Sequence, residues 1–428
     1  MHHGSALPEE VARRVAALKK ADIVIGIPSY NNSSTIGQVA AAAAAGAATC
    51  FPGLRAVLLN SDGRSTDGTQ GVVLAQELPP GVESLAFTYA GLPGKGSALR
   101  AIFEVTVALD ATACVVVDSD LRSIRPDWIG RLAGPVFEGY DFVAPYYVRH
   151  KHDATITNTI CYPLTRALYG LRVRQPIGGD FGFSGALARR YLAKDVWSTD
   201  VARFGVDIFM TTTAVVESGE VVQAALGAKV HDAKDPGSDL GPMFRQVVST
   251  LFGMICDYEA VWKNVTGSRP VEVRGAADIG PVEPEQVPID ERRLVEAFRA
   301  GRRTCGHIWE AVLGRAALSA LDALVASQDP GLPADLWVDI VYGFAKAYCQ
   351  GAVDRASLVQ ALSPLYNGRI AAFAREARHM TSVEAEALVE RQSILFEQKK
   401  PEFVRAWDTC LGRACLGTAP GRQRRRCR

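Results

Sequence analysis

Apolar runs and helical patterns alternate along the chain from about residue 21 to residue 263. Short runs of apolar and β-branched residues predict strands, and apolar residues three or four positions apart predict helices. The predicted strands are 22–27, 54–60, 84–89, 113–118, 141–147 and 221–226. The helices predicted between them include 35–45, 96–109, 155–169 and 207–217. This alternation predicts an α/β fold, a Rossmann-like and mostly parallel sheet with helices on both faces.

The pattern changes after this region. Residues 264–290 are rich in Pro, Gly, Val and Glu without a period, which predicts a linker or an extended arm. Residues 291–408 show helical spacing alone and predict an all-helical C-terminal domain, which is also a candidate homo-oligomer interface. Residues 1–20 form an N-terminal segment, and residues 409–428 form a basic tail without apolar anchors that we expect to be disordered.

Composition narrows the class of protein. The 428 residues are 48% hydrophobic with a formal net charge of +1, which is typical of a soluble globular protein and disfavours nucleic acid or anionic membrane as a partner. No apolar run approaches the length of a membrane span, and residues 1–5 lack the pattern of a signal peptide. The nine cysteines form no CxxC pair, and Cys114, Cys161 and Cys256 lie in apolar segments as expected of small buried residues. We therefore predict a reducing, cytoplasmic location.

One predicted strand, 113–118, ends in two carboxylates, Asp118 and Asp120. Ligands of open α/β sheets bind at the carboxyl ends of the strands. Two neighbouring carboxylates repel each other unless a cation or a donor neutralises them, and Mg²⁺ or Mn²⁺ bound there commonly bridges to a diphosphate. The Asp-x-Asp is therefore a candidate metal–nucleotide site, although acids after strands also serve as turn residues and helix caps.

Three more polar loops follow successive predicted strands. The first holds Pro28, Tyr30 and Asn32, and fits either a loop over a nucleotide or simple helix capping. The second holds Asp62, which could accept hydrogen bonds from a base or a ribose. The third places Lys95 between two glycines at a helix start, where backbone donors, the helix dipole and an ammonium group favour a phosphate. The spacing of a Walker A loop is absent.

Later segments extend this pattern. They are the basic stretch from Tyr147 to Thr157, Gln-Pro-Ile-Gly-Gly-Asp at 175–180, Gly-Val-Asp at 205–207, and Lys-Val-His at 229–231. With the Asp-x-Asp loop, this order over residues 21–260 resembles the GT-A glycosyltransferases. Within them it looks like the retaining mannosylglycerate and glucosylglycerate synthases, with the glucosyl-3-phosphoglycerate synthases as more distant relatives.

The resemblance implies a metal and donor site. Asp120 would bind Mg²⁺ or Mn²⁺ directly, His231 would complete the protein ligands, and Asp118 would lie towards the ribose or the metal. His231 could instead be a surface histidine at a strand end. The implied donor-binding residues are Pro28, Tyr30, Asn32, Asp62, Lys95, Asp118, Ser119, Gly178, Gly179 and Asp180.

The resemblance also implies catalytic and acceptor residues. The catalytic candidates are Asp207, Asp180 and Lys95, where Asp207 would orient hydroxyl groups or could simply favour a helix start. Relatives commonly carry Glu at the position of Asp180. The implied acceptor-binding residues are Arg149, Lys151, Thr155, Thr157 and Asn158, because a small carboxylate requires a cation. A solvated basic loop is the alternative. The Gly-Gly-Gly-Arg loop of phosphoglycerate-using relatives is missing.

The implied activity is that of a cytoplasmic, metal-dependent, retaining glycosyltransferase. Its partners would be a nucleoside-diphosphate sugar, UDP-glucose or GDP-mannose, and D-glycerate or a similar small hydroxy acid. Three alternatives remain open at this point: a glycosyltransferase with a glycan or lipid acceptor, a sugar-nucleotide pyrophosphorylase, and a non-catalytic nucleotide-binding interaction protein.

Overall fold

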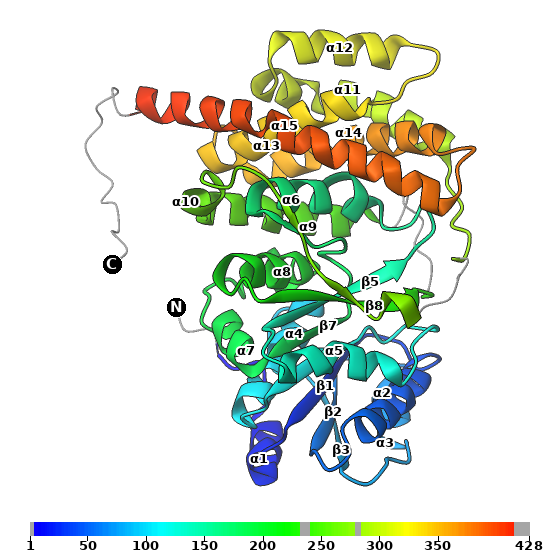
Figure 1. The fold of residues 1–428 in the computed structure, drawn as a ribbon. Coiled ribbons are helices and arrows are strands. Elements are labelled where there is room, and N and C mark those ends of the chain that lie inside the picture. The colour runs from blue at the N-terminus through cyan, green and yellow to red at the C-terminus, as the bar shows by residue number, and fades with distance from the viewer. Residues whose placement is uncertain (1–3, 232–239, 279–283, 415–428) are drawn as a thin grey trace.

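Two stacked parts make up the molecule, a sheet with its flanking helices and a layer of helices packed on one end of it (Figure 1). The computed structural model describes residues 4–231, 240–278 and 284–414. The chain enters the sheet part first and builds the helical layer in its second half, as the change of pattern in the sequence predicts.

An eight-stranded sheet forms the first part, in the order β10-β8-β5-β7-β4-β1-β2-β3. Its strands are β1 (Ile23–Ser29), β2 (Ala56–Asp62), β3 (Val82–Thr88), β4 (Ala113–Val116), β5 (Phe142–Val148), β7 (Phe181–Ser184), β8 (Val221–Ala228) and β10 (Val273–Arg274). Among these strands β7 alone is antiparallel to its neighbours β4 and β5, and the other pairs are parallel. A small second sheet pairs β6 (Leu171–Arg172) with β9 (Arg269–Pro270).

Both faces of the large sheet are buried because strand side chains alternate between two hydrophobic cores. In β1, Val24 points into one core and Ile23 and Ile25 point into the other. The helices on the Val24 side are α1 (Glu9–Leu18), α4 (Lys95–Ala108), α7 (Gly185–Leu192) and α8 (Val206–Glu217). Those on the opposite side are α2 (Ile36–Cys50), α3 (Thr69–Leu74) and α5 (Asp127–Phe137). The predicted α/β class, a mostly parallel sheet covered on both faces, is confirmed.

The helical layer has its own core, which includes the buried Trp309 and Trp337. From the C-terminal half come α11 (Glu291–Val312), α12 (Arg315–Ala326), α13 (Ala334–Gln350), α14 (Arg355–Glu376) and α15 (Ser382–Ala414). The first half adds a π-helical turn, η1 (Thr157–Cys161), with α6 (Tyr162–Tyr169), α9 (Leu240–Asp257) and α10 (Glu259–Trp262). Because α6 and α9 share this core, the two parts are joined by continuous packing. The predicted helical C-terminal region is confirmed.

Several segments differ in detail from the sequence-based expectation. The antiparallel β7 and the helix α9 were not predicted, and the arm at 264–290 contributes the short strands β9 and β10. Strand β4 ends at Val116, so Asp118 and Asp120 both lie in the loop after it. Helix α15 continues past residue 408 to Ala414, and the rest of the basic tail, 415–428, lies outside the described residues.

The cysteines require one correction. Cys114 and Cys161 are buried free thiols, as predicted. Cys256 is instead half-buried and forms a disulfide with Cys349, which joins α9 to α13 with a Cα–Cα distance of 5.5 Å. The two residues are separated by 93 positions, so the sequence offered no sign of the pair. The prediction of a reducing compartment loses the support that it drew from unpaired cysteines.

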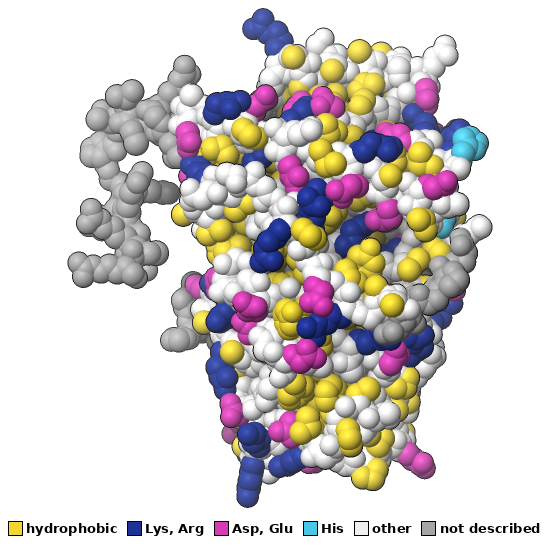
Figure 2. All heavy atoms as spheres, in the orientation of Figure 1, with side chains coloured by type: hydrophobic (Ala, Val, Ile, Leu, Met, Phe, Trp, Pro, Cys, Tyr) yellow, Lys and Arg dark blue, Asp and Glu magenta, His cyan; other side chains and the backbone are white. Residues whose placement is uncertain are grey.

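Charges are mixed on the surface. On the face shown in Figure 2, basic and acidic side chains are interspersed over both parts of the molecule. Many of them form ion pairs, such as Arg302 with Asp322 and Lys399 with Asp339. None of the helices in the described ranges has the length and apolar character needed to cross a bilayer.

Candidate functional site

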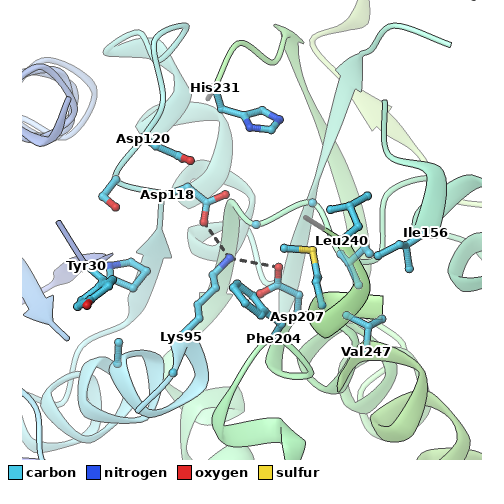
Figure 3. Close-up of a pocket in the computed structure, with 18 of the residues that line it drawn as sticks. Tyr30, Lys95, Asp118, Asp120, Ile156, Phe204, Asp207, His231, Leu240 and Val247 are labelled. Carbon is cyan, nitrogen blue, oxygen red and sulfur yellow. Dashed lines mark hydrogen bonds and ion pairs between the residues drawn. The ribbon is translucent and has the colours of Figure 1, made fainter. Parts of the chain in front are cut away.

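A cavity of about 930 Å³ opens at the edge of the sheet where the parallel strands end. Loops that follow β1, β2, β3, β4, β5 and β8 supply its wall, together with the loop that precedes the antiparallel β7. One half of the wall is polar and includes Asp118, Asp120 and His231. The other half, beyond Asp207, is apolar and includes Ile156, Leu240 and Val247 (Figure 3). The carboxyl ends of the strands therefore converge on one site, as the sequence predicts.

Asp118 lies between two lysines. Lys95 Nζ lies 2.8 Å from Asp118 Oδ1, and Lys229 Nζ lies 2.9 Å from Asp118 Oδ2. Lys95 also contacts Asp207 Oδ2 at 3.2 Å, as the dashed lines in Figure 3 show. Both oxygens of Asp118 are thus held by ammonium groups, so this carboxylate positions the lysines and is poorly placed to coordinate a metal.

Asp180 is buried behind Asp118 and Lys229 and holds both of them in place. Its carboxylate accepts hydrogen bonds from the Asp118 backbone N–H at 2.8 Å, from Lys229 Nζ at 2.8 Å and from the Tyr147 hydroxyl. The side chain has no exposed surface and lies outside the cavity wall. The prediction that Asp180 contacts the donor or acts in catalysis therefore needs correction, because its oxygens are occupied by the residues that they position.

Two glycines permit this close packing. A Cβ at Gly179 would lie 2.2 Å from Asp118 Oδ2, and the φ of +90° is one that other residues rarely adopt. A Cβ at Gly96 would lie 1.8 Å from the carbonyl oxygen of Val201. The first glycine brings the loop before β7 against Asp118, and the second seats the start of α4, which carries Lys95. Gly178 and Gly179 both line the cavity.

Burial and charge act in opposite directions on these groups. Burial disfavours the ammonium of Lys95, but the carboxylates of Asp118 and Asp207 outweigh it and raise the pKa of Lys95. Burial likewise opposes ionisation of Asp118, yet Lys229 and Lys95 lower its pKa. For Asp207 burial dominates, and its pKa is raised despite the contact with Lys95. The Lys95–Asp118–Lys229 set is therefore fully charged at neutral pH.

Asp207 differs from the other acids because one of its oxygens lacks a partner. It sits in the first turn of α8 and is 8% exposed. Oδ2 pairs with Lys95, whereas the buried Oδ1 has no hydrogen-bond partner among the described residues. A buried carboxylate oxygen without a partner is costly. Because Asp207 lines the cavity, a hydroxyl group of a bound ligand is a natural donor to it.

Asp120 and His231 line the same polar half of the cavity (Figure 3). A carboxylate and an imidazole are suitable ligands for Mn²⁺ or Mg²⁺ and leave coordination positions for phosphate oxygens and water. Within the described residues, no group of three or more His, Cys, Asp or Glu side chains could hold a metal alone. The donor set therefore fits an ion that is bound together with a diphosphate.

His231 is held in its neutral form. Burial is the largest cause that lowers its pKa, and Lys229 and Arg149 add to the effect. Arg149 Nη2 lies 3.1 Å from His231 Nε2, and Arg149 Nε donates to Asp153 at 2.7 Å. Since a guanidinium can only donate, Nε2 carries a lone pair, as a metal ligand requires. Arg149 shares that lone pair in the present arrangement.

The loop after β1 forms the outer wall of the polar half. Pro28, Tyr30 and Asn32 line the cavity, and Asn32 Oδ1 accepts a hydrogen bond from Ser119 Oγ at 2.8 Å. Tyr30 is 65% exposed, which leaves its ring available to a ligand. Ser119 also lines the cavity. These four predicted donor-binding residues are thus brought together.

Asp62 is placed differently. It has no exposed surface and lies outside the cavity wall, and it accepts hydrogen bonds from Ser29 Oγ at 2.8 Å and from Ser65 N at 2.7 Å. The prediction that it contacts a base or a ribose needs correction, because its oxygens fix the shape of the two loops instead. Its loop neighbour Arg64, with a positive φ of 70°, is the residue that reaches the cavity.

The predicted acceptor residues divide into two groups. Arg149, Thr155 and Thr157 line the cavity, although Thr155 Oγ1 also bonds the Tyr366 hydroxyl at 2.6 Å. Lys151 does not, because its ammonium donates to the carbonyl oxygens of Ala377 and Met380, beyond the end of α14. Asn158 does not either, because its side chain is bonded to Arg174 Nη2 at 2.9 Å.

Two important residues of the site were not predicted. Lys229, with a side chain 4% exposed, is an isolated cation just after the apolar strand β8, which is a signal that could have found it. His152 lines the cavity, and its Nδ1 lies 3.2 Å from the Val287 carbonyl oxygen, which fixes the proton on Nδ1. Its buried Nε2 lone pair has no partner among the described residues, and burial lowers its pKa.

Comparisons with known proteins give the following. No family model and no curated protein matches this chain. Solved structures of glucosyl-3-phosphoglycerate synthase from Mycobacterium tuberculosis are similar in structure to this chain. The complex with Mn²⁺, UDP-glucose and phosphoglyceric acid is 23% identical, with a TM-score of 0.42 over 59% of this chain and 86% of that chain. The complex with Mg²⁺ and UDP is 25% identical, with a TM-score of 0.41 over 59% of this chain and 84% of that chain.

Proposed function

We propose that this protein is a metal-dependent glycosyltransferase that moves glucose or mannose from a nucleoside-diphosphate sugar to a small hydroxy acid. One observation carries the proposal. Asp120, His231 and Lys95 open onto one cavity at the strand ends, and a buried network of Lys229, Asp118 and Asp180 fixes Lys95 in place.

The balance of charge in the polar half supports a metal. The cations in it or directly behind it are Lys95, Lys229, Arg149 and Arg64, and the carboxylates are Asp118, Asp120, Asp153, Asp180 and Asp207. Because the carboxylates outnumber the cations among the described residues, these groups alone would repel a diphosphate. A divalent ion such as Mg²⁺ or Mn²⁺ at Asp120 and His231 would supply the missing positive charge and stabilise the departing diphosphate.

The chain's own residues would bind and orient the substrates. Lys95 is half-buried and held by Asp118 and Asp207, and a positioned ammonium near the leaving group would stabilise charge that grows during transfer. Tyr30 would pack against the base, and the backbone at Gly178 and Gly179 permits close approach of the sugar. Asp207 Oδ1 would accept a hydrogen bond from a sugar or acceptor hydroxyl and hold it in position.

The finer assignments belong to the same proposal. Retention of the anomeric configuration, UDP-glucose or GDP-mannose as donor, and D-glycerate or a similar hydroxy acid as acceptor follow from the resemblance of the loop sequences. Arg149 supports a carboxylate in the acceptor because its guanidinium reaches the cavity wall. A cytoplasmic location and a homo-oligomer through the C-terminal helices remain predictions.

A donor-by-acceptor assay tests the proposal. Purified protein is incubated with UDP-glucose or GDP-mannose, with Mg²⁺ or Mn²⁺, and with D-glycerate, and the product is identified by mass spectrometry and NMR. We expect a metal-dependent glycoside with the anomeric configuration of the donor. Inverted configuration would exclude the retaining mechanism. Release of pyrophosphate from a nucleoside triphosphate and a sugar phosphate, without any transfer, would exclude the glycosyltransferase itself.

A further inference from the structure

The cavity continues past Asp207 into an apolar half. Its wall comes from the loop before β7, the loop before α8, the residue before η1 and the first turns of α9. The six residues are Ile156, Ile177, Phe204, Leu240, Met243 and Val247. Figure 3 shows Ile156, Leu240 and Val247 gathered on the far side of Asp207 from Asp120 and His231. We call these six residues the apolar wall.

The apolar wall is more than the edge of a hydrophobic core. Phe204 is 37% exposed, and Ile177, Leu240 and Met243 are only half-buried. Apolar surface that faces the open space of a cavity is unfavourable when it is hydrated. A ligand whose body is apolar would remove this surface from water, whereas a ligand with further hydroxyl or phosphate groups would lose hydration without gaining partners.

Two hydroxyl-binding groups also line the cavity. Asp207 Oδ1 and His152 Nε2 are acceptors without a partner among the described residues, and both residues line the cavity. They can receive the proton of a hydroxyl group. His152 Nε2 cannot donate to a carboxylate or a phosphate, because His152 carries its proton on Nδ1.

Of the two cations predicted to bind the acceptor, only Arg149 lines the cavity, beside His231 in the polar half. Lys151 is engaged outside the cavity by the carbonyl oxygens of Ala377 and Met380. Arg149 reaches the wall, but Asp153 compensates its charge at 2.7 Å. One partly compensated cation suits a single carboxylate and is insufficient for a dianionic phosphate as well.

We infer that the acceptor is a 2-hydroxy acid with an apolar side group, whose carboxylate faces Arg149, whose hydroxyl faces Asp207 and whose side group packs on the apolar wall. This inference depends on the proposed glycosyltransferase activity and specifies its acceptor class. It predicts that D-glycerate, which has a hydroxymethyl group at the position of the apolar group, is a weaker substrate than its apolar analogues.

A series of acceptors tests the inference with the intact protein. D-Glycerate, 3-phosphoglycerate, lactate, 2-hydroxy-4-methylpentanoate and 3-phenyllactate are compared at saturating donor and metal. We expect kcat/KM for the last two acids to exceed that for lactate about tenfold or more, since one to several buried carbons in an apolar pocket contribute that much. Preference for D-glycerate or 3-phosphoglycerate would overturn the inference while leaving the proposed function intact.

A variant locates the side group. Met243→Gln keeps the length of the side chain but places an amide on the wall, and it should lower the ratio of kcat/KM for phenyllactate over lactate severalfold. Leu74→Gln on α3, where Leu74 is 53% exposed and lies outside the cavity, is the matched control and should leave the ratio unchanged. An unchanged ratio in Met243→Gln would overturn the assignment of this wall.

Calorimetric measurement of UDP and GDP binding distinguishes a failure of the proposed glycosyltransferase function from a failure of the inferred acceptor class. Binding of a nucleotide with no transfer to the apolar acids but transfer to D-glycerate contradicts the inference alone. Absence of nucleotide binding, together with absence of transfer to every acid, contradicts the proposed function and the inference that depends on it.

Discussion

Buried charges occur in two regions of this molecule, at the strand ends and inside the helical layer, and the regions use them differently. In the helical layer Arg166, 1% exposed, pairs with Glu390 at 2.6 Å and with Glu397 at 2.7 Å. At the strand ends Lys229, 4% exposed, pairs with Asp118 and Asp180. Both cations have two carboxylate partners, so burial and pairing alone do not distinguish a functional site from a structural one.

The difference lies in what surrounds each pair. The helical pair joins α6 to α15 across a packed interface, and the guanidinium also donates to the Tyr162 hydroxyl. The strand-end pair adjoins a cavity, and within the part of the chain that the structure describes the Asp207 Oδ1 atom on its wall has no hydrogen-bond partner. Because each cluster has a cation surrounded by carboxylates, it is the adjoining cavity and the buried oxygen of Asp207 without a partner among the described residues that indicate a ligand, whereas closed packing around Arg166 indicates a structural role.

The largest expected effect is that of Lys229→Met, which should lower both the stability of the protein and its affinity for UDP. Lys229→Met leaves the fully buried carboxylate of Asp180 and the partly exposed carboxylate of Asp118 with less compensation, which should lower the free energy of unfolding by about 3–5 kcal/mol. Because Lys229 helps to hold Asp118, which positions Lys95, the affinity for UDP should fall as well. Urea unfolding measures the first quantity and calorimetry measures the second.

Arg166→Met is the matched control for that variant. It removes a buried cation of the helical layer but leaves carboxylates that are partly exposed, so it should lower the free energy of unfolding by less, about 1–3 kcal/mol. Its folded fraction should bind UDP as the unmodified protein does. If both variants lose UDP affinity equally, the proposed division between a functional and a structural cluster is wrong.

Asp120→Asn tests the strand-end site separately from stability, because it should change the rate of transfer and leave the fold intact. The change keeps the shape of the side chain but removes a negative ligand of the proposed metal, so kcat/KM for transfer should fall about a hundredfold or more, with a small effect on stability. Asp110→Asn is the control, because Asp110 is 71% exposed and its φ of 48° suits asparagine. Near-normal transfer by Asp120→Asn in the presence of Mn²⁺ would exclude Asp120 as a metal ligand.

The sequence predicted the location of the site better than the roles within it. Acids and glycines that follow apolar strands could be placed at one edge of a parallel sheet, and Asp118, Asp120, Lys95 and His231 do meet there. The direction of each side chain could not be predicted. Asp62 and Asp118 both follow strands, yet Asp62 points into its own loop, because Ser29 and Ser65 offer donors to it.

Features that depend on contacts between distant parts of the chain could not be predicted from the sequence either. The four residues of β7 give no period that separates an antiparallel strand from a loop, and its pairing between β4 and β5 depends on distant partners. The position of Lys229 after an apolar strand marked it in the sequence, but its carboxylate partners Asp118 and Asp180 became evident only in the fold. Periodicity predicts elements, whereas tertiary contacts decide which charged residues compensate one another.

The disulfide offers an effect that should be confined to stability. Cys349→Ser opens the link between α9 and α13, and the loss of a cross-link across 93 residues should lower the free energy of unfolding by about 2–4 kcal/mol. The unmodified protein in the presence of a reductant should behave in the same way. Because α9 also carries Met243 of the apolar wall, a change in acceptor preference without loss of stability would show that the link shapes the site instead.

The smallest expected effect concerns the pH dependence of the helical pair. Burial opposes ionisation of Glu397, but hydrogen bonds from Arg166 and Ser268 outweigh it and lower the pKa of Glu397 below its ordinary value of 4.5. A carboxyl whose pKa is lowered by folding stabilises the protein above the unfolded pKa, and this contribution is lost as the pH falls through the folded pKa. The free energy of unfolding should therefore decline between about pH 5 and about pH 3, by less in Glu397→Gln than in the unmodified protein.

The difference should be below about 1 kcal/mol, because the pair is partly exposed to solvent. Urea unfolding at several pH values measures both slopes, and equal slopes would mean that Arg166 stabilises the layer by packing and not by its charge.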